Sequence, residues 1–293
     1  TRTTAYDWNN TGGFDGLIAQ FDPSRVGAAQ LRWSTYLGGD KDDWAVLPRG
    51  AVSASNIVTV IGASASSNFP TLAGGYSTTN AGGFDDFVSC FDPSQSGASQ
   101  LIYSTLFGGS LDDQLNIGAI DASGAVTFGG WSASSDRPVT SGAYSSTMRG
   151  GAWDGYFVRL NPGGNGAADL LYSTYLGGSS DEGINGLVLD SSGAIYATGT
   201  TLSTDFPTTA GAYNTTSNFG AGDGFVVKLS PDALGSADLK YSSYLGGSSW
   251  DYGYALDLAR SGEVVVTVLT GSSDFPTSSG ALDTTLNGPS DTA

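Results

Sequence analysis

One seven-residue phrase that returns at near-constant spacing constrains this chain more than any other feature of its sequence. It reads WSTYLGG from Trp33, YSTLFGG from Tyr103, YSTYLGG from Tyr172 and YSSYLGG from Tyr241, with spacings of 70, 69 and 69 residues. Such a period is typical of repeat proteins, in which each unit buries its apolar face against the next. We therefore expect a single domain over residues 1–293, with repeat phases of about 31–99, 100–168, 169–237, and 238–293 plus 1–30.

Other residues keep the same period. An aspartate opens an apolar segment that reads D-G-F-V or close to it in every copy: Asp15, Asp85, Asp154 and Asp223. A proline closes each of these segments: Pro23, Pro93, Pro162 and Pro231. The four copies are therefore in phase along nearly the whole chain.

The third copy shows what one unit contains. Four runs rich in β-branched and aromatic residues are bounded by Gly, Ser, Asp or Pro: LLYSTYLGG from Leu170, INGLVLD from Ile184, AIYATGTT from Ala194 and DGFVVKLS from Asp223. Such runs are typical of strands, and no segment has the apolar period and caps of a helix. The pattern predicts an all-β fold, a β-propeller of four four-stranded repeats of about 70 residues.

The run YSTYLGGSSDEGINGLVLDSSGAIYATGTTLSTDFPTTAGAY resembles the SBBP-type β-propeller repeat of bacterial secreted and surface proteins. The resemblance implies a propeller in an extracellular setting, secreted or at the cell surface. Two departures stand out. Arg137 replaces the Phe found in the other copies, and residues 52–55 read VSAS where the third copy has an Asp-Ser-Ser-Gly turn.

The two ends of the chain carry complementary parts of one unit. The N-terminus opens with a fourth strand, GFDGLIAQFDPS from Gly13, and the C-terminus ends after a third strand, EVVVTVLTGSS from Glu263. We expect the N-terminal strand to pair with the three C-terminal strands and close the ring. Two alternatives stay open, because residues 282–291 repeat the phase of residues 6–15. The chain is part of a longer array, or its terminal strand completes the sheet of a neighbouring molecule.

Charge and composition exclude several classes of function. The chain has 11 basic and 28 acidic residues, a net charge of −17, which disfavours nucleic acids and anionic membrane surfaces as partners. No run of apolar residues is long enough to insert into a membrane. The chain has no histidine and a single cysteine, so a histidine-based triad and an internal disulfide are excluded. Because the chain starts at Thr1 and its only methionine is Met148, we expect a processed or excised product.

Acidic residues after each Gly-Gly pair are candidate calcium ligands, because carboxylates near the carbonyls of glycine-rich turns suit a hard cation. The candidates are Asp42, Asp43, Asp112, Asp113, Asp181, Glu182 and Asp251. The spacing matches no EF-hand loop, and the alternative is that these side chains cap turns by accepting backbone N–H groups. Calcium is the one cofactor that we consider.

Two further sets of residues are candidates for ligand binding. Asp15, Asp85, Asp154 and Asp223 recur at one structural position, so in a ring they form a circle of carboxylates for a cation or polar ligand, or else simple Asx turns. Trp44 and Trp250 stand beside the acidic turns, where exposed rings suit contacts with carbohydrate or protein. The alternative for the tryptophans is packing between repeats.

Near-identical repeats argue against catalysis, because an acid and a base need different environments, and no G-x-S-x-G motif is present. We therefore expect a non-catalytic scaffold or adhesion module that binds a cell-surface protein or glycan, or copies of itself, through its loops. The alternatives are a self-assembling subunit of an extracellular fibre or layer, a lectin-like glycan binder and a carboxylate-based glycoside hydrolase.

Overall fold

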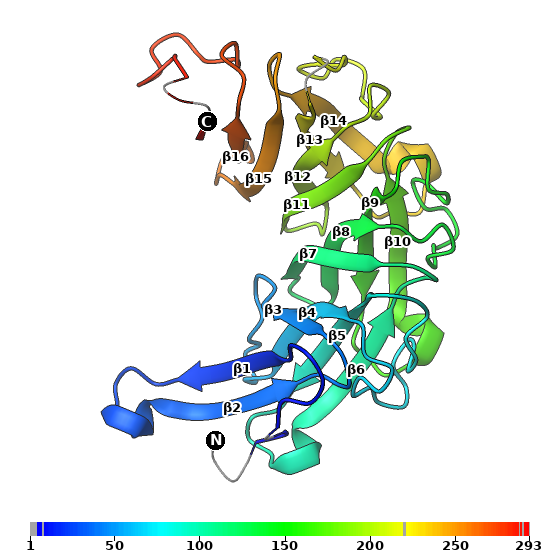
Figure 1. Cartoon of the computed structure of the whole chain (residues 1–293), viewed down its shortest axis with the longest axis vertical. Helices are drawn as coiled ribbons and strands as arrows, with labels where there is room; N and C mark the ends of the chain where they lie inside the picture. Colours follow the sequence, from blue (N-terminus) through cyan, green and yellow to red (C-terminus); the bar gives the residue numbers. More distant parts are fainter. Residues whose placement is uncertain (1–4, 8, 219–220, 287, 289, 293) are drawn as a thin grey trace.

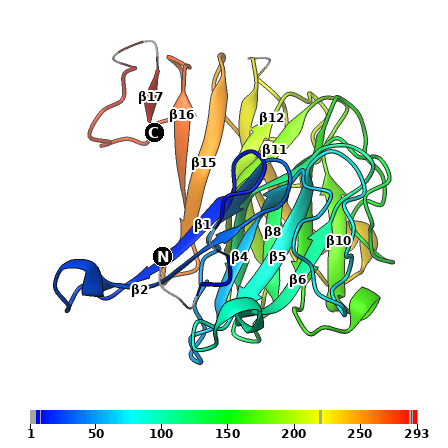
Figure 2. The same ribbon diagram turned by 60° about the horizontal axis from the view of Figure 1, so that its bottom comes forward.

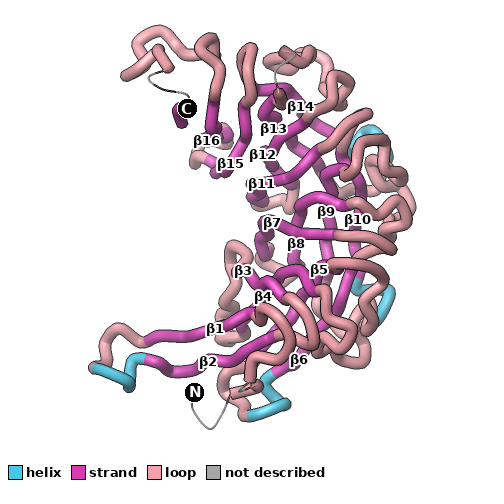
Figure 3. Tube along the Cα trace, in the orientation of Figure 1, coloured by secondary structure: helices cyan, strands magenta, loops and turns pink. Residues whose placement is uncertain are grey.

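The computed structural model describes the whole chain except residues 1–4, 8, 219–220, 287, 289 and 293. Its described residues form antiparallel sheets that follow one another along an arc, with short 3-10 turns as the only helices (Figures 1 and 3). The expected all-β, propeller-like architecture is confirmed.

Three sheets contain four strands each, in sequence order from the inner strand on the concave side to the outer strand (Figure 1). The first contains β3 (Asp43–Val46), β4 (Val58–Ser64), β5 (Asp85–Phe91) and β6 (Leu101–Phe107). The second contains β7 (Asp113–Ile120), β8 (Val126–Ser132), β9 (Asp154–Leu160) and β10 (Leu170–Leu176). The third contains β11 (Glu182–Leu189), β12 (Ile195–Thr201), β13 (Asp223–Leu229) and β14 (Leu239–Leu245).

The two ends of the arc are incomplete sheets. At one end, β1 (Gly16–Phe21) pairs only with β2 (Leu31–Leu37). At the other end, β15 (Asp251–Leu258) pairs with β16 (Val264–Thr270), and β16 pairs with the short β17 (Asp291–Thr292). Four 3-10 helices precede the outer strands: η1 (Gly27–Gln30), η2 (Gly97–Gln100), η3 (Gly166–Asp169) and η4 (Gly235–Asp238).

The expected order of strands within a sheet is wrong by one position. The strand that contains LLYSTYL, β10, is the last strand of its sheet and pairs with the preceding β9, rather than opening the sheet that contains β11. The short η3 connection returns the chain antiparallel to β9, whereas the Gly-Gly turn that follows β10 carries it into the next sheet.

The expected closure of the ring is also absent from the described residues. The N-terminal strand pairs with β2 and the C-terminal β16 pairs with β17, so the two ends belong to separate sheets. Figure 2 shows β17 beside β16 and away from β1. Each end thus keeps an edge that a complete sheet does not have.

Packing between consecutive sheets supplies the core. Three apolar clusters lie between β1–β2 and the first sheet, between the first and second sheets, and between the second and third sheets. Because neighbouring sheets cover both faces, β4 and β5 are buried along their whole length. Trp33 and Cys90 lie in these clusters.

The repeated phrase on the outer strand organises the long connection between the second and third strands. On β10, the Ser173 hydroxyl donates to the carbonyl of Pro138 at 2.7 Å, and the Thr174 hydroxyl accepts the N–H of Ser145 at 2.8 Å. The connection thereby runs along the outer strand and covers an edge that would otherwise offer unpaired backbone groups. The phrase is therefore a structural motif, and it leaves the opposite, inner strands uncovered.

Candidate functional site

The four Gly-Gly pairs that end the repeated phrase lie at one edge of the sheets, where first and third strands begin and second and fourth strands end. We call this the diglycine edge, defined by Gly38–Gly39, Gly108–Gly109, Gly177–Gly178 and Gly246–Gly247. Most of the candidate residues from the sequence fall here, so the geometry of this edge decides what they do.

A buried carboxylate begins each inner strand and accepts the N–H of the second glycine. The four are Asp43, Asp113, Glu182 and Asp251, with carboxylate-to-nitrogen distances of 2.6 to 2.8 Å. Serine hydroxyls add to this, as Ser134 donates to Asp113 at 2.9 Å and Ser272 to Asp251 at 2.8 Å. These acids hold the turn that carries the chain from one sheet to the next.

A second carboxylate lies against the first glycine of each pair. One oxygen of Asp15, Asp85, Asp154 and Asp223 accepts a backbone N–H from the preceding loop at 2.7 to 3.1 Å. The other oxygen, Oδ1, is buried and has no hydrogen-bond partner among the described residues. A Cβ atom built on Gly108 would lie 2.2 Å from Oδ1 of Asp85 and 3.0 Å from Oδ2 of Asp113, so only glycine fits between the two acids. The predicted circle of aspartates is thus a set of pairs, each made with the acid of an inner strand.

Burial and mutual repulsion raise the pKa values of these carboxyl groups. Burial raises the pKa of Asp85 to about 7 and that of Asp154 to about 6, and the neighbouring carboxylates add to both shifts. The pKa values of Asp43, Glu182 and Asp223 are raised for the same reasons. The protein therefore holds protons at these pairs at pH values where an exposed aspartate has lost its own.

The adjacent acids predicted as calcium ligands point to different places. Asp42 and Asp112 accept the backbone N–H of Phe14 and Phe84, at 3.0 and 2.9 Å, in the loops that precede the third strands. Asp181 accepts the N–H of Ala152 in the same way. Among the residues that the structure describes, no group of three or more acidic, cysteine or histidine side chains is placed to hold a metal ion. Calcium binding stays a prediction, but in the three turns that have two adjacent acids the carboxylates point to different partners.

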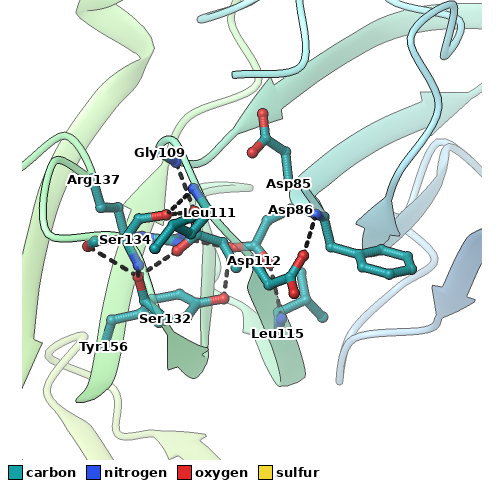
Figure 4. Close-up of polar contacts among 12 residues, drawn as sticks. Asp85, Asp86, Gly109, Leu111, Asp112, Leu115, Ser132, Ser134, Arg137 and Tyr156 are labelled. Carbon is teal, nitrogen blue, oxygen red and sulfur yellow. Dashed lines mark hydrogen bonds and ion pairs between the residues drawn. The ribbon is translucent and has the colours of Figure 1, made fainter. Parts of the chain in front are cut away.

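In the second repeat, charged side chains form a contact between neighbouring sheets that is apolar in the third repeat. Arg137 is buried, forms ion pairs with Asp86 and with Asp113 at 3.0 Å, and lies 3.5 Å from the centre of the Tyr156 ring (Figure 4). The Tyr156 hydroxyl donates to Asp86. In the third repeat the corresponding contact is apolar, with Phe206 stacked on Phe225 at 4.7 Å. Sequence analysis noted Arg137 as a departure but gave no signal for its acidic partner.

Aromatic pairs are the other feature of the diglycine edge. The ring centres of Trp44 and Phe84 are 5.1 Å apart, those of Trp131 and Trp153 are 5.6 Å apart, and Trp250 stacks on Tyr252 at 5.3 Å. The side chains of Trp44 and Trp153 are 48% and 41% exposed. Sequence analysis did not select Trp131 and Trp153 as binding residues, because Trp131 lies on β8, Trp153 lies in the loop before β9, and their positions hold other residues in the other repeats.

Stacked four-stranded antiparallel sheets joined by one recurring turn are typical of β-propeller repeat proteins. Residues 171–207, from β10 through β12 to Pro207, match the family model SBBP, the beta-propeller repeat, and the predicted resemblance is thereby confirmed. No curated protein matches the chain in a sequence comparison. No helix among the described residues is long and apolar enough to cross a membrane.

The raised carboxyl pKa values predict that acidification stabilises the fold. The folded state holds protons that the unfolded chain releases near 3.8, the ordinary pKa of an aspartate, so stability falls as pH rises toward the folded pKa of about 7 for Asp85. We expect the melting temperature to fall between about pH 4 and pH 7. Asp85→Asn should flatten this dependence and Asp22→Asn, at a surface turn, should not; equal profiles for the three proteins would contradict the assignment.

The buried ion pairs predict a large penalty for removing Arg137 alone. Arg137→Met leaves Asp86 and Asp113 buried without their cation, which costs about 3–5 kcal/mol. The triple variant Asp86→Gly, Arg137→Phe, Tyr156→Phe recreates the apolar contact of the third repeat and should recover most of that loss. Urea unfolding measures both, and a triple variant less stable than the single one would refute this interpretation.

Proposed function

We propose that this chain is a non-catalytic scaffold or adhesion module that binds a cell-surface glycan or protein at its diglycine edge. The observation that carries the proposal is the set of three aromatic pairs at that edge, two of them with a ring more than 40% exposed. Partly exposed aromatic rings on a rigid frame offer flat apolar contact at little entropic expense. A secreted or cell-surface location follows from the family resemblance and belongs to the same proposal.

The carboxylate pairs support a non-catalytic function rather than glycoside hydrolysis. Each pair accepts backbone N–H groups and encloses a glycine, so its acids hold the chain rather than face a substrate. The same arrangement recurs in all four copies, whereas a glycosidase places its acid and its second carboxylate on either side of one bond. The carboxylate pairs thus stabilise the turns between sheets, and the aromatic pairs form the proposed binding surface.

Removing the exposed rings tests the proposal. We expect the double variant Trp44→Ala, Trp153→Ala to lose at least tenfold in binding to the wild-type ligands on a glycan array and on intact bacterial cells, because two flat contact surfaces are lost. Tyr213→Ala removes a ring that is 66% exposed in the long connection and serves as the matched control. Unchanged binding by the double variant would refute the role of the edge.

A second candidate, assembly with copies of itself, is favoured by the two incomplete sheets. Leu17 and Phe21 of β1 are 61% and 65% exposed, whereas the corresponding Phe87 and Phe91 of β5 are fully buried. At the other end, a cavity of about 510 Å3 lies where an outer half-sheet would pack, lined among others by Tyr241, Val226, Tyr196, Val264 and Val266.

The backbone register at the C-terminal end is suited to such an addition. Thr270 pairs with Asp291 as Thr201 pairs with Asp223 in the complete third sheet, so β17 follows the path of a third strand. We propose that β1 of a second copy displaces β17 from β16, that β2 of that copy adds outside β1, and that head-to-tail chains result. Pairing within one chain would instead give the closed four-sheet ring expected from the sequence.

Native mass against concentration separates these outcomes. Head-to-tail addition predicts multiples of 29.8 kDa. Leu17→Lys places a charge on the added strand and should shift the distribution to the monomer, whereas Val26→Lys, in the exposed β1–β2 connection, should leave it unchanged. A monomer at every concentration would refute self-assembly.

A further inference from the structure

The inner strands β7, β11 and β15 lie side by side on the concave side of the arc (Figures 1 and 3). Each of them contains a β-bulge, because the pairing register shifts between Leu115 and Ile117, between Ile184 and Gly186, and between Gly253 and Ala255. The extra residues are Asn116, Asn185 and Tyr254. A bulge re-aims the side chain at the extra position.

The two asparagines link consecutive inner strands and are fixed by those links. Nδ2 of Asn116 donates to the carbonyl of Ile184 at 2.8 Å, and Nδ2 of Asn185 donates to the carbonyl of Gly253 at 3.0 Å. A carbonyl accepts only from the nitrogen of an amide, so the orientation of each amide is determined. Within the described part of the chain, neither Oδ1 atom receives a hydrogen bond, and both stay available as acceptors.

These residues line one cavity. It has a volume of about 310 Å3 and is lined by Asn116, Asn185, Tyr252 and Tyr254, with Tyr254 58% exposed. The volume lies at the lower end of the range for small-molecule sites. None of these lining residues is charged, in a protein whose net charge is −17. Two aromatic rings beside preoriented amide acceptors offer both stacking and hydrogen bonding.

We propose that this cavity binds an uncharged saccharide, one or two sugar units of a neutral glycan. Sugar rings present flat C–H faces to the tyrosines and donate hydroxyl hydrogen bonds to the two Oδ1 atoms, and neither contact requires charge. Tyr252 also stacks on Trp250 at 5.3 Å, so the cavity adjoins an aromatic pair of the diglycine edge. The inference rests on the proposed binding function and specifies one ligand class and one site for it.

Calorimetry with defined oligosaccharides tests the site. The probes are neutral hexasaccharides of glucose, mannose and galactose, with hexagalacturonate as the charged comparison. We expect wild-type protein to bind at least one neutral probe and to bind the charged probe at least tenfold more weakly. Tyr254→Ala should weaken the neutral probe at least tenfold, Tyr254→Phe should weaken it less, and Tyr213→Ala should leave it unchanged.

Several outcomes would overturn the inference. They are the absence of binding to every neutral probe, tighter binding of hexagalacturonate, and a Tyr254→Ala variant that binds like wild type. The Trp44→Ala, Trp153→Ala variant separates this site from the edge. If that variant loses glycan binding while Tyr254→Ala keeps it, the edge proposal stands and the cavity proposal fails; the reverse result supports the cavity alone.

Discussion

The hydrogen bond from the second glycine of each Gly-Gly pair to the acid that begins the next inner strand is the contact on which the array depends. It forms where the chain leaves one sheet for the next, as at Gly109 and Asp113 with a distance of 2.6 Å. The turn needs a strong acceptor for its N–H group, and it needs no Cβ, because a second carboxylate occupies that space. The structure therefore places two carboxylates together in the interior, and their repulsion is relieved by protonation and by hydrogen bonds to the backbone.

The second repeat shows how far this arrangement can be modified. Arg137 lies where other copies place a phenylalanine, and it brings a cation within 3.0 Å of Asp113. A lone guanidinium at this depth would be strongly destabilising, but Asp86 and Tyr156 also differ from their counterparts in the other repeats: Asp86 pairs with the guanidinium, and the Tyr156 hydroxyl donates to Asp86. Charge here replaces aromatic stacking between the same two sheets, so one interface in the array differs in chemistry from the others while keeping their geometry.

The sequence predicts the repeats, the strands and the acidic positions well, because each depends on local patterns of residues. It does not predict where one sheet ends, because in a cyclic series of four strands the Gly-Gly turn and the η3 connection are equally plausible boundaries. Contacts between residues that are far apart in the sequence are also not predicted from it. Asp85 lies close to Asp113 across a Gly-Gly turn, and Trp131 of β8 contacts Trp153 of the loop before β9. The sequence predicts that the adjacent acids Asp112 and Asp113 bind one calcium ion together. Successive residues point to different partners at the start of β7, so Asp112 accepts the N–H of Phe84 and Asp113 that of Gly109.

Equivalent positions of the repeats fall into two groups, those that stabilise the fold and those that we propose to bind a ligand. Where the copies agree, as at Asp43, Asp113 and Asp251, the side chain is buried and bound to backbone. The next residue along each inner strand differs in every copy: Trp44, Gln114, Gly183 and Tyr252. The bulge position holds asparagine at 116 and 185 but tyrosine at 254. A side chain that the fold does not require is free to vary, and those that differ between copies include the rings and amides that line the inner cavity and the diglycine edge. The binding chemistry that we propose for this protein therefore lies in the differences between its repeats.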